Sequence, residues 1–303
     1  MNYKKIFSSQ KTRFAILRAL NWVPDGIMLR LQYRIKNGFW PNFKKPKRLT
    51  EKLQLYKIKY RNPVMHQCVD KYEVRKYVKS KGLGYILNDL YGVYDNPDEI
   101  NFDELPNQFV MKTTTGGGGQ NIVIVNDKLS CHVDEIKKQL FLWVSSNNIG
   151  AIAGREWAYQ NCKPRIIVEK LLEDQSAPSL IDYKFFCFNG EPVCCQVITG
   201  RWDIECIDFY DEQWNHQSYV GFNTYAGPEF GNSPMKLQKP SNYEEMWFIA
   251  GKLAADFPFV RVDLYSIQGK TIFGELTFYP ASGYGYFTPD EFDLELGSYF
   301  TEY

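Results

Sequence analysis

Apolar and polar residues alternate along two neighbouring stretches near the end of the chain, residues 259–265 and 270–278. A period of two predicts β-strands with one buried face. The four residues between them end in Gly269, which readily takes the positive φ of a tight turn. We therefore predict a β-hairpin. Arg261 and Asp263 share one face of its first strand, and Glu275 and Thr277 share one face of its second.

Where these two faces coincide, an arginine, two carboxylates and a hydroxyl group meet on a small area of sheet. Oxygen ligands of this kind suit Mg²⁺, which usually takes one or two carboxylates together with substrate phosphates. The alternative is a surface hairpin whose charges form ordinary salt bridges. The hairpin alone does not decide between the two interpretations.

A run of four glycines lies between two further stretches of strand pattern, residues 108–112 and 122–125. It lacks the following helix and the GK[ST] ending of a Walker-type loop, and it does not match a dinucleotide-binding fingerprint. Glycine backbone can still wrap a phosphate, and Lys112 supplies a positive charge beside it. The alternative is a flexible hairpin tip. The candidate phosphate-binding residues are Lys112, Gly116, Gly117, Gly118 and Gly119.

Residues 165–170 predict a buried strand that ends in polar residues. The backbone at the end of this strand suits a hinge that contacts an adenine edge, and its apolar neighbours suit the ring. The alternative is an ordinary strand end. The candidate adenine-site residues are Glu169, Lys170, Leu171 and Leu172.

A second hairpin is predicted over residues 182–188 and 192–198, with Asn-Gly as its turn. Asp182 and Lys184 share one face of its first strand. They are candidates to hold a ribose hydroxyl and a phosphate oxygen, and the alternative is a cross-strand ion pair.

Helical spacing of apolar residues predicts helices elsewhere in the chain. The predicted ranges are 8–35 with a break at 24–26, 53–60, 63–81, 133–143, 154–160 and 243–255. Ser241 or Asn242 is expected to cap the last of these. Residues 207–234 are expected to be rich in loops. Lys71, in the helix over 63–81, offers a second ammonium group for a phosphate, although most lysines simply lie on the surface.

The N-terminal region is strongly basic. Residues 1–61 hold 16 lysines and arginines against two acidic residues, Asp25 and Glu51. The apolar residues of its helices recur at helical spacing: Phe14, Leu17, Leu20, Met28, Leu31 and Ile35. Such a region could contact an anionic membrane or a lipid-linked anion. The alternative is an amphipathic helix that docks its apolar face on the body and leaves a basic face in water.

Length and composition change this picture little. The chain has 303 residues, 44% of them hydrophobic, and a formal net charge of +1, which gives no indication of a nucleic-acid partner. Seven cysteines without metal-ligand spacing and three scattered histidines do not predict a zinc site, and reduced thiols indicate the cytosol. No apolar run approaches the ~20 residues of a membrane span, and no signal peptide is expected. We predict a cytoplasmic protein, with a place at the inner face of the membrane if the basic region binds lipid.

The order of these parts resembles the ATP-grasp superfamily over residues 70–283. Five stretches are similar, more specifically, to the teichuronopeptide-biosynthesis (TupA-like) ATP-grasp family: EKLQLYKIKYRNP, VDKYEVRKYV, DYKFFCFNGEP, FPFVRVDLY and GELTFYPASG. The resemblance implies an α+β fold in which two α+β lobes clasp ATP, preceded by a basic helical N-terminal segment. The expected divisions are residues 1–60, 61–168 with the glycine-rich lid loop, and 169–303 with the metal site.

The resemblance also implies roles for individual residues, with ATP and Mg²⁺ as the cofactors. Lys71 and Lys112 bind phosphates, and residues 116–119 cover them. Residues 169–172 line the adenine site, with Asp182 at the ribose. Asp263, Glu275 and Thr277 hold Mg²⁺, and Arg261 steadies an acyl phosphate. Lys184 and Arg201 take the places of phosphate- or carboxylate-binding cations. One departure is Thr277, because many ATP-grasp ligases have asparagine two residues after the metal-binding glutamate.

The activity that the resemblance implies is that of an ADP-forming carboxylate–amine ligase acting through an acyl phosphate. Its substrates would be an amino acid or amine and a uronic acid of a capsule, O-antigen or teichuronic polymer. Two alternatives stay open. One is a phosphotransferase or glycosyltransferase-like enzyme that modifies polysaccharide. The other is a non-catalytic nucleotide-binding partner in a membrane-associated polysaccharide assembly.

Overall fold

The structure, a computed structural model, describes residues 10–116, 121–145, 153–174, 179–200, 204–223 and 229–303. A four-stranded antiparallel sheet forms one part of it, with strand order β1-β4-β2-β3. The strands are β1 (Leu90–Tyr94), β2 (Phe109–Thr113), β3 (Ile122–Val125) and β4 (Ile166–Glu169). Helix α7 (Val133–Ser145) packs on this sheet, with Leu140 in the same buried cluster as Phe109 and Met111.

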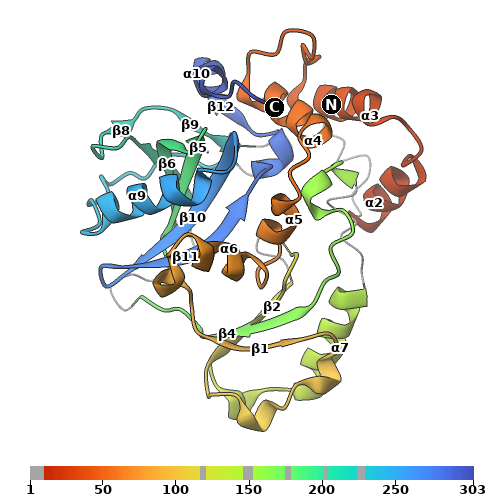
Figure 1. Ribbon diagram of the computed structural model, residues 1–303, viewed down its shortest axis with the longest axis vertical. Helices are drawn as coiled ribbons and strands as arrows, with labels where there is room; N and C mark the ends of the chain where they lie inside the picture. The colour runs from red at the N-terminus through yellow and green to blue at the C-terminus, as the bar shows by residue number, and fades with distance from the viewer. Residues whose placement is uncertain (1–9, 117–120, 146–152, 175–178, 201–203, 224–228) are drawn as a thin grey trace.

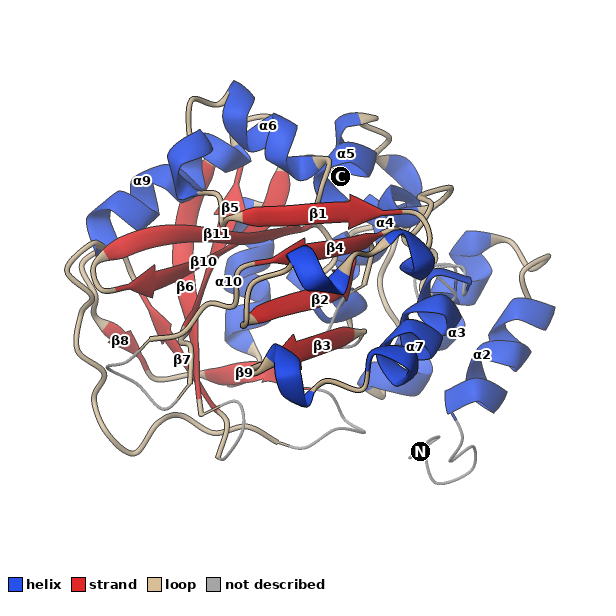
Figure 2. Cartoon of the chain, turned by 90° about the horizontal axis from the view of Figure 1, so that it is seen from below, coloured by secondary structure: helices blue, strands red, loops and turns tan. Residues whose placement is uncertain are grey.

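A larger antiparallel sheet has the order β11-β10-β5-β6-β7-β8. Its strands are β5 (Asp182–Phe188), β6 (Glu191–Thr199), β7 (Cys206–Tyr210), β8 (His216–Gln217), β10 (Phe259–Ile267) and β11 (Lys270–Thr277). Helix α9 (Tyr243–Ala254) packs on it, and a ribbon of β9 (Val220–Asn223) and β12 (Tyr286–Thr288) lies beside it. Phenylalanines and tyrosines dominate the core between these elements. The two sheets lie next to one another, as Figure 1 and Figure 2 show.

Short helices join the two sheets. Helix α4 (Leu49–Lys59) packs against α10 (Glu291–Tyr299) and against the 3₁₀ turn Pro280–Gly283. Helices α5 (Val64–Val69) and α6 (Val74–Ser80) follow. Tyr56 of α4 is fully buried and donates a hydrogen bond of 3.0 Å to the Phe259 carbonyl of β10. The N-terminal half of the chain is thereby fixed to the large sheet.

The hairpin predicted near the end of the chain is confirmed as β10 and β11. Gln268 and Gly269 form its turn with φ values of 50° and 76°. Two positive φ values in succession are typical of the turns that match the twist of a hairpin. Gly269 therefore stands where the backbone conformation favours it.

Three local predictions are wrong. The helix expected over 63–81 is divided into α5 and α6, because the Asp70 carboxylate accepts the N–H groups of Tyr72 and Glu73, each at 2.9 Å, and starts a second helix. Asn242 precedes α9 without capping it, since its side chain bonds Thr271 and Ser266 instead.

The third error concerns the middle of the chain. Within residues 154–160, the part expected to be a helix contains the 3₁₀ turn Trp157–Tyr159. Residues 207–234, expected to be rich in loops, hold the short strands β7, β8 and β9 between loops, and aromatic residues of this range pack in the core. In the first case packing against distant residues overrides the local pattern.

The N-terminal helices are α2 (Gln10–Ala19) and α3 (Asp25–Asn37), which lie at one edge of the molecule (Figure 2). The apolar face predicted for α3 is wrong in part. Met28 is buried, but Leu31 and Ile35 are 43% and 50% exposed. The buried side of α3 instead carries Gln32 and Tyr33, because these residues find hydrogen-bond partners on the body of the protein.

Candidate active site

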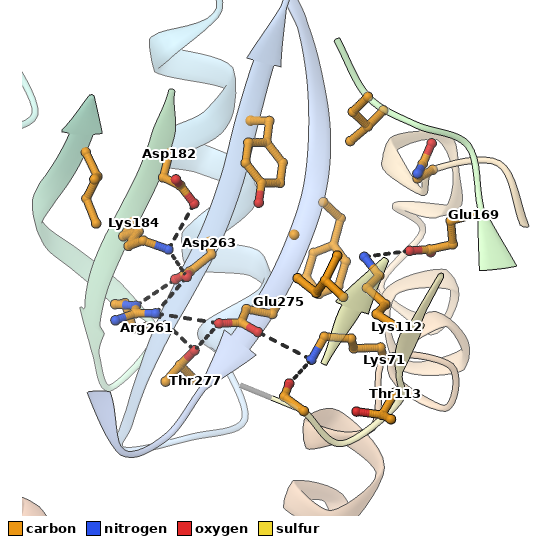
Figure 3. Close-up of a pocket in the computed structure, with 18 of the residues that line it drawn as sticks. Lys71, Lys112, Thr113, Glu169, Asp182, Lys184, Arg261, Asp263, Glu275 and Thr277 are labelled. Carbon is orange, nitrogen blue, oxygen red and sulfur yellow. Dashed lines mark hydrogen bonds and ion pairs between the residues drawn. The ribbon is translucent and has the colours of Figure 1, made fainter. Parts of the chain in front are cut away.

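A cavity of about 580 Å³ lies between the two sheets. Figure 3 shows that residues of β10 and β11 face lysines from the other side of this cavity. Most of the residues predicted from sequence line it: Lys71, Lys112, Gly116, Glu169, Leu172, Asp182, Lys184, Arg261, Asp263, Glu275 and Thr277. The fold therefore brings together residues that lie up to about two hundred positions apart in the sequence.

The register of the β10–β11 hairpin places the predicted metal-site residues opposite one another. Arg261 pairs with Thr277, and Asp263 pairs with Glu275. The register shifts by a bulge directly after Asp263, opposite Gly274. A Cβ atom on Gly274 would lie 2.8 Å from the Asp263 carbonyl oxygen, so this close approach requires glycine. The face of β10 that carries Arg261 and Asp263 therefore coincides with the face of β11 that carries Glu275 and Thr277, as predicted.

Arg261 organises the centre of this cluster. Its Nε donates to Asp263 Oδ1 and its Nη2 to Asp263 Oδ2, both at 2.7 Å. Nη2 also donates to Thr277 Oγ1 at 3.2 Å and lies 3.7 Å from Glu275 Oε1. Burial alone would raise the pKa of Asp263, but Arg261 and Lys184 outweigh it, and the pKa falls below its usual value. Asp263 is thus held as a carboxylate.

Lys184 joins two carboxylates on the floor of the cavity. Its ammonium group donates to Asp263 Oδ2 and lies 3.1 Å from Asp182 Oδ1. All three side chains are buried. Lys184 of β5 therefore forms a cross-strand ion pair, with Asp263 of β10. Asp182 and Lys184 also line the cavity, where the sequence predicted a ligand.

Lys71 and Lys112 approach from the opposite side. Lys71 donates to the Gly116 carbonyl oxygen and lies 3.8 Å from Glu275 Oε2. Burial lowers the pKa of Lys71, and Glu275 offsets part of this effect. Lys112 lies 2.8 Å from Glu169 Oε2, and Arg75 bonds Glu169 Oε1 at 3.2 Å. Glu169, the last residue of β4, therefore anchors two cations at the cavity.

Thr113 is a cavity residue that sequence reasoning missed. Its side chain is buried, and its hydroxyl has no hydrogen-bond partner within the described residues. A buried hydroxyl without a partner is costly, so one that belongs to the cavity lining fits a polar ligand such as a phosphate. The sequence did contain one indication of this residue. Thr113 is polar although it continues the alternating core-facing positions Phe109 and Met111 of the strand.

A second polar group, also missed, lines the cavity at Glu156 and Ser282. Ser282 Oγ donates to Glu156 Oε1 at 2.5 Å, and Lys57 donates to Ser282 Oγ at 3.0 Å and to the Ser282 carbonyl at 2.7 Å. Burial lowers the pKa of Lys57 to about 7 and raises that of Glu156. Ser282 lies in the left-handed region at φ 53° within the stretch PASG, which carried a resemblance but no predicted role.

Some predicted residues are placed elsewhere or are not described. Lys170 and Leu171 do not belong to the cavity lining, and the Lys170 ammonium lies 3.5 Å from Asp89. The backbone N–H and C=O of Lys170 bond Asp89 and Asn88. Predicted residues outside the described part are Gly117, Gly118, Gly119 and Arg201. The functional roles assigned to all the residues named above stay predictions.

The donor set fits Mg²⁺. No group of three or more His, Cys, Asp or Glu side chains able to hold a metal occurs in the described part of the chain. Mg²⁺ needs only one or two carboxylates when phosphates supply further ligands. Asp263 accepts three hydrogen bonds and keeps one of about four acceptor positions, whereas Glu275 Oε1 accepts one, from Thr277. Glu275 is therefore the main candidate ligand, with Asp263 adding one oxygen.

Sequence comparison assigns the family. Residues 51–301 match the family described as TupA-like ATPgrasp. The chain belongs to the TupA-like ATP-grasp family. The predicted family and the predicted α+β ATP-grasp fold are both confirmed. Comparison with curated proteins gives no match. No helix in the described residues of this ATP-grasp chain is long and apolar enough to cross a membrane.

Solved structures of several ligases and synthetases are similar to this ATP-grasp chain. One is D-alanine–D-alanine ligase from Bacillus anthracis complexed with ATP, with 16% identity, TM-score 0.39, and coverage of 70% of this chain and 54% of that one. The ligase of the same name from Helicobacter pylori has 16% identity, TM-score 0.40, and coverage of 78% and 60%. The ADP complex of purK, an N5-carboxyaminoimidazole ribonucleotide synthetase, has 14% identity, TM-score 0.43, and coverage of 75% and 50%. This chain spans 50–60% of the length of these three proteins.

Proposed function

We propose that this protein is an ATP-dependent, ADP-forming ligase that joins a carboxylate to an amine. The observation that carries the proposal is the convergence of Lys71 and Lys112 with Arg261, Asp263 and Glu275 around one cavity. Cations that can hold phosphates face carboxylates that can hold Mg²⁺ there. The buried Thr113 hydroxyl adds a polar group without a partner among the described residues.

ATP is the first substrate of the proposed reaction. Lys71 and Lys112 bind its phosphates, Glu169 and Leu172 line the adenine site, and Asp182 contacts the ribose. Glu275 and Asp263, with Thr277, would hold Mg²⁺, which would offset negative charge on the phosphates. The glycine run 116–119 is the segment that we expect to cover the phosphates, and residues 117–119 lie outside the described part of the chain.

The chemistry has two steps and needs no protein nucleophile. The γ-phosphoryl group of ATP passes to an oxygen of the substrate carboxylate, which gives an acyl phosphate and ADP. The amine nitrogen then attacks the acyl carbon, inorganic phosphate leaves, and the nitrogen loses its extra proton as the amide forms. Arg261 stabilises the negative charge that develops on the carbonyl and phosphoryl oxygens, because its guanidinium is already fixed by Asp263.

The carboxylate that we propose is a uronic acid of a surface polysaccharide, and the amine is an amino acid or a related amine. This assignment rests on the resemblance to teichuronopeptide biosynthesis. We also propose that the protein acts in the cytoplasm, where ATP is available.

The test is ADP release by purified protein with ATP, Mg²⁺ and mixtures of uronates and amino acids. We expect Lys112→Ala and Glu275→Ala to abolish it. Lys163→Ala is the matched control, because it removes an ion pair of the same length, 2.8 Å to Asp95, but lies outside the cavity, so this variant should retain activity. Undiminished ADP release by Glu275→Ala would overturn the metal assignment. Product mass separates the alternatives: an amide is the sum of its two substrates less water, whereas a phosphotransfer product gains a phosphoryl group.

A further inference from the structure

Helix α3 presents an unusual face to solvent. Ile27, Arg30, Leu31, Arg34 and Ile35 follow the spacing i, i+3, i+4, i+7, i+8, so they form one stripe along the helix. All five are exposed, with Ile27 at 53%. An apolar stripe on a globular protein normally faces the core. Here the helix buries a mixed side that carries Met28, Leu29, Gln32, Tyr33 and Asn37, and it leaves three large aliphatic side chains in water.

Hydrogen bonds to the body of the protein hold Gln32 and Tyr33 on the buried side of α3. Gln32 donates to the Ala153 carbonyl at 2.9 Å and accepts from the Tyr284 hydroxyl at 2.8 Å. Tyr33 shares a hydrogen bond of 2.8 Å with Thr50 Oγ1. These bonds fix the rotation of α3 about its axis. The apolar stripe cannot turn inward without leaving several buried polar groups unpaired.

Exposed tryptophans flank α3 in the sequence on both sides. Trp22 precedes α3 and is 80% exposed, and Trp40 follows it and is 60% exposed. Tryptophan is favoured at the interface between lipid and water because its ring is apolar and its N–H is polar. We call Trp22, Trp40 and the five residues of the stripe the α3 face.

The charge around the α3 face has one sign. Residues 21–47 contain six basic residues and one acidic residue, Asp25. Asp25 is already within 3.2 Å of Arg155. Glu51, the other acidic residue of the N-terminal region, is buried and accepts backbone N–H groups at residues 42, 47 and 48. Within the described part of the chain, neither Arg30 nor Arg34 forms an ion pair with an acidic residue.

We propose that the α3 face docks on the surface of an anionic phospholipid bilayer. Leucine, isoleucine and tryptophan side chains enter the interfacial layer, while Arg30 and Arg34 extend toward lipid phosphates. The charge decides between possible occupants, because two copies of this basic face repel one another. An apolar protein surface would not explain the arginines within the stripe.

The docking also has a consequence for the cleft. Tyr284, which bonds the buried side of α3, follows closely on Ser282, which lines the cavity. The Glu156 and Ser282 end of the cavity therefore lies on the other side of α3 from the bilayer. This point rests on the proposed ligase activity: it suits a carboxylate or amine substrate that is attached to a lipid.

The test uses the full chain and vesicles, without ATP. Sedimentation with phosphatidylcholine vesicles containing phosphatidylglycerol should bring down the protein, and pure phosphatidylcholine should bind it at least about tenfold more weakly. Raising the salt concentration should release it. Leu31→Glu, and separately Arg30→Glu with Arg34→Glu, should each lower the partition coefficient about tenfold or more. Phe248→Glu is the matched control, because Phe248 is also exposed, at 66%, but lies on α9.

Several results would overturn the proposal. One is equal binding by Leu31→Glu and the unaltered protein, and another is equal binding to neutral and anionic vesicles. No binding to either vesicle also overturns it, and light scattering then shows whether a second copy covers the face. Circular dichroism and thermal melting of each variant establish that it is folded. If the unaltered protein binds anionic vesicles but releases no ADP in the ligase assay, the proposed ligase activity alone is overturned.

Discussion

The cavity and the α3 face both contain several basic side chains, but these side chains are paired with carboxylates only in the cavity. In the cavity, Lys112 and Lys184 each lie within about 3 Å of a carboxylate, and Arg261 bonds both oxygens of Asp263. On the α3 face, neither Arg30 nor Arg34 is paired with a carboxylate in the described part of the chain. One region has neutralised its charges internally, and the other presents them to water.

Burial explains the difference. A buried charge is tolerated when it is paired and hydrogen-bonded, whereas an exposed charge is solvated and needs no partner. A lysine of the cavity can turn from its carboxylate partner to a phosphate of a bound ligand and still be paired with a negative charge. The exposed arginines can gain a partner without losing one. The same residue type therefore suits small-molecule binding in one region and surface recognition in the other.

The largest expected effect comes from removing the shared carboxylate of the cavity. Asp263→Ala leaves Lys184 and Arg261 buried without their common partner, and we expect the free energy of unfolding to fall by about 3–5 kcal/mol. Urea denaturation measures this. Glu244→Ala is the control, because it breaks only an exposed pair with Lys239 and should change the free energy of unfolding far less. Equal losses for the two variants would show that the cavity charges are not coupled as described.

Asp293 sharpens the comparison, because it is a buried carboxylate held by neutral groups. It accepts the Thr50 N–H at 3.0 Å and the Thr50 hydroxyl at 2.7 Å, while Arg48 lies 3.8 Å away. Burial raises the pKa of Asp293 to about 6, opposite to the shift of Asp263. In the unfolded chain the pKa of an aspartate is about 4.

Because the folded pKa is the higher one, the folded state binds more protons between pH 4 and 6. The stability that Asp293 contributes is fully present below about pH 4 and is lost as the pH rises through 6. The difference amounts to about 3 kcal/mol. Asp293→Asn, which keeps an acceptor for the Thr50 N–H, should remove this part of the pH dependence. Parallel stability–pH curves for the two proteins would contradict the prediction.

Thr277 tests the metal side of the cavity with a smaller change. Thr277→Val removes a hydroxyl that joins Arg261 and Glu275, each at 3.2 Å, and should cost about 1 kcal/mol of stability. We expect it also to weaken Mg²⁺-dependent ATP binding in calorimetry. Thr277→Asn restores a polar group and should bind at least as well as the unaltered protein. Unchanged binding by Thr277→Val would remove Thr277 from the metal site.

The smallest expected effect lies on the α3 face. Arg30→Glu with Arg34→Glu should change the free energy of unfolding by no more than about 0.5 kcal/mol per residue, because both side chains are exposed. Urea denaturation of this variant beside Asp263→Ala compares the two regions directly. A loss of several kcal/mol would mean that these arginines stabilise the fold and are not free for recognition.

Much of the cavity was predictable because its signals are local. Strand alternation placed Arg261 with Asp263, and the glycine run marked Lys112 as the residue beside it. Glu156, Ser282 and Lys57 were not predictable, because each comes from a different segment and no spacing relates them. Thr113 was overlooked because threonine is common in strands and its unbonded hydroxyl is visible only in three dimensions.

The sequence by itself determined the family, the hairpin of β10 and β11, and the shared face of Arg261 and Asp263, because side-chain alternation is a property of the strand alone. Only the tertiary structure decided which side of α3 is buried. That choice depends on Ala153 and Tyr284, more than a hundred residues away, which bond Gln32 and so turn Leu31 and Ile35 toward solvent. Periodicity shows that a helix has two faces, but the partner surface determines which one is covered.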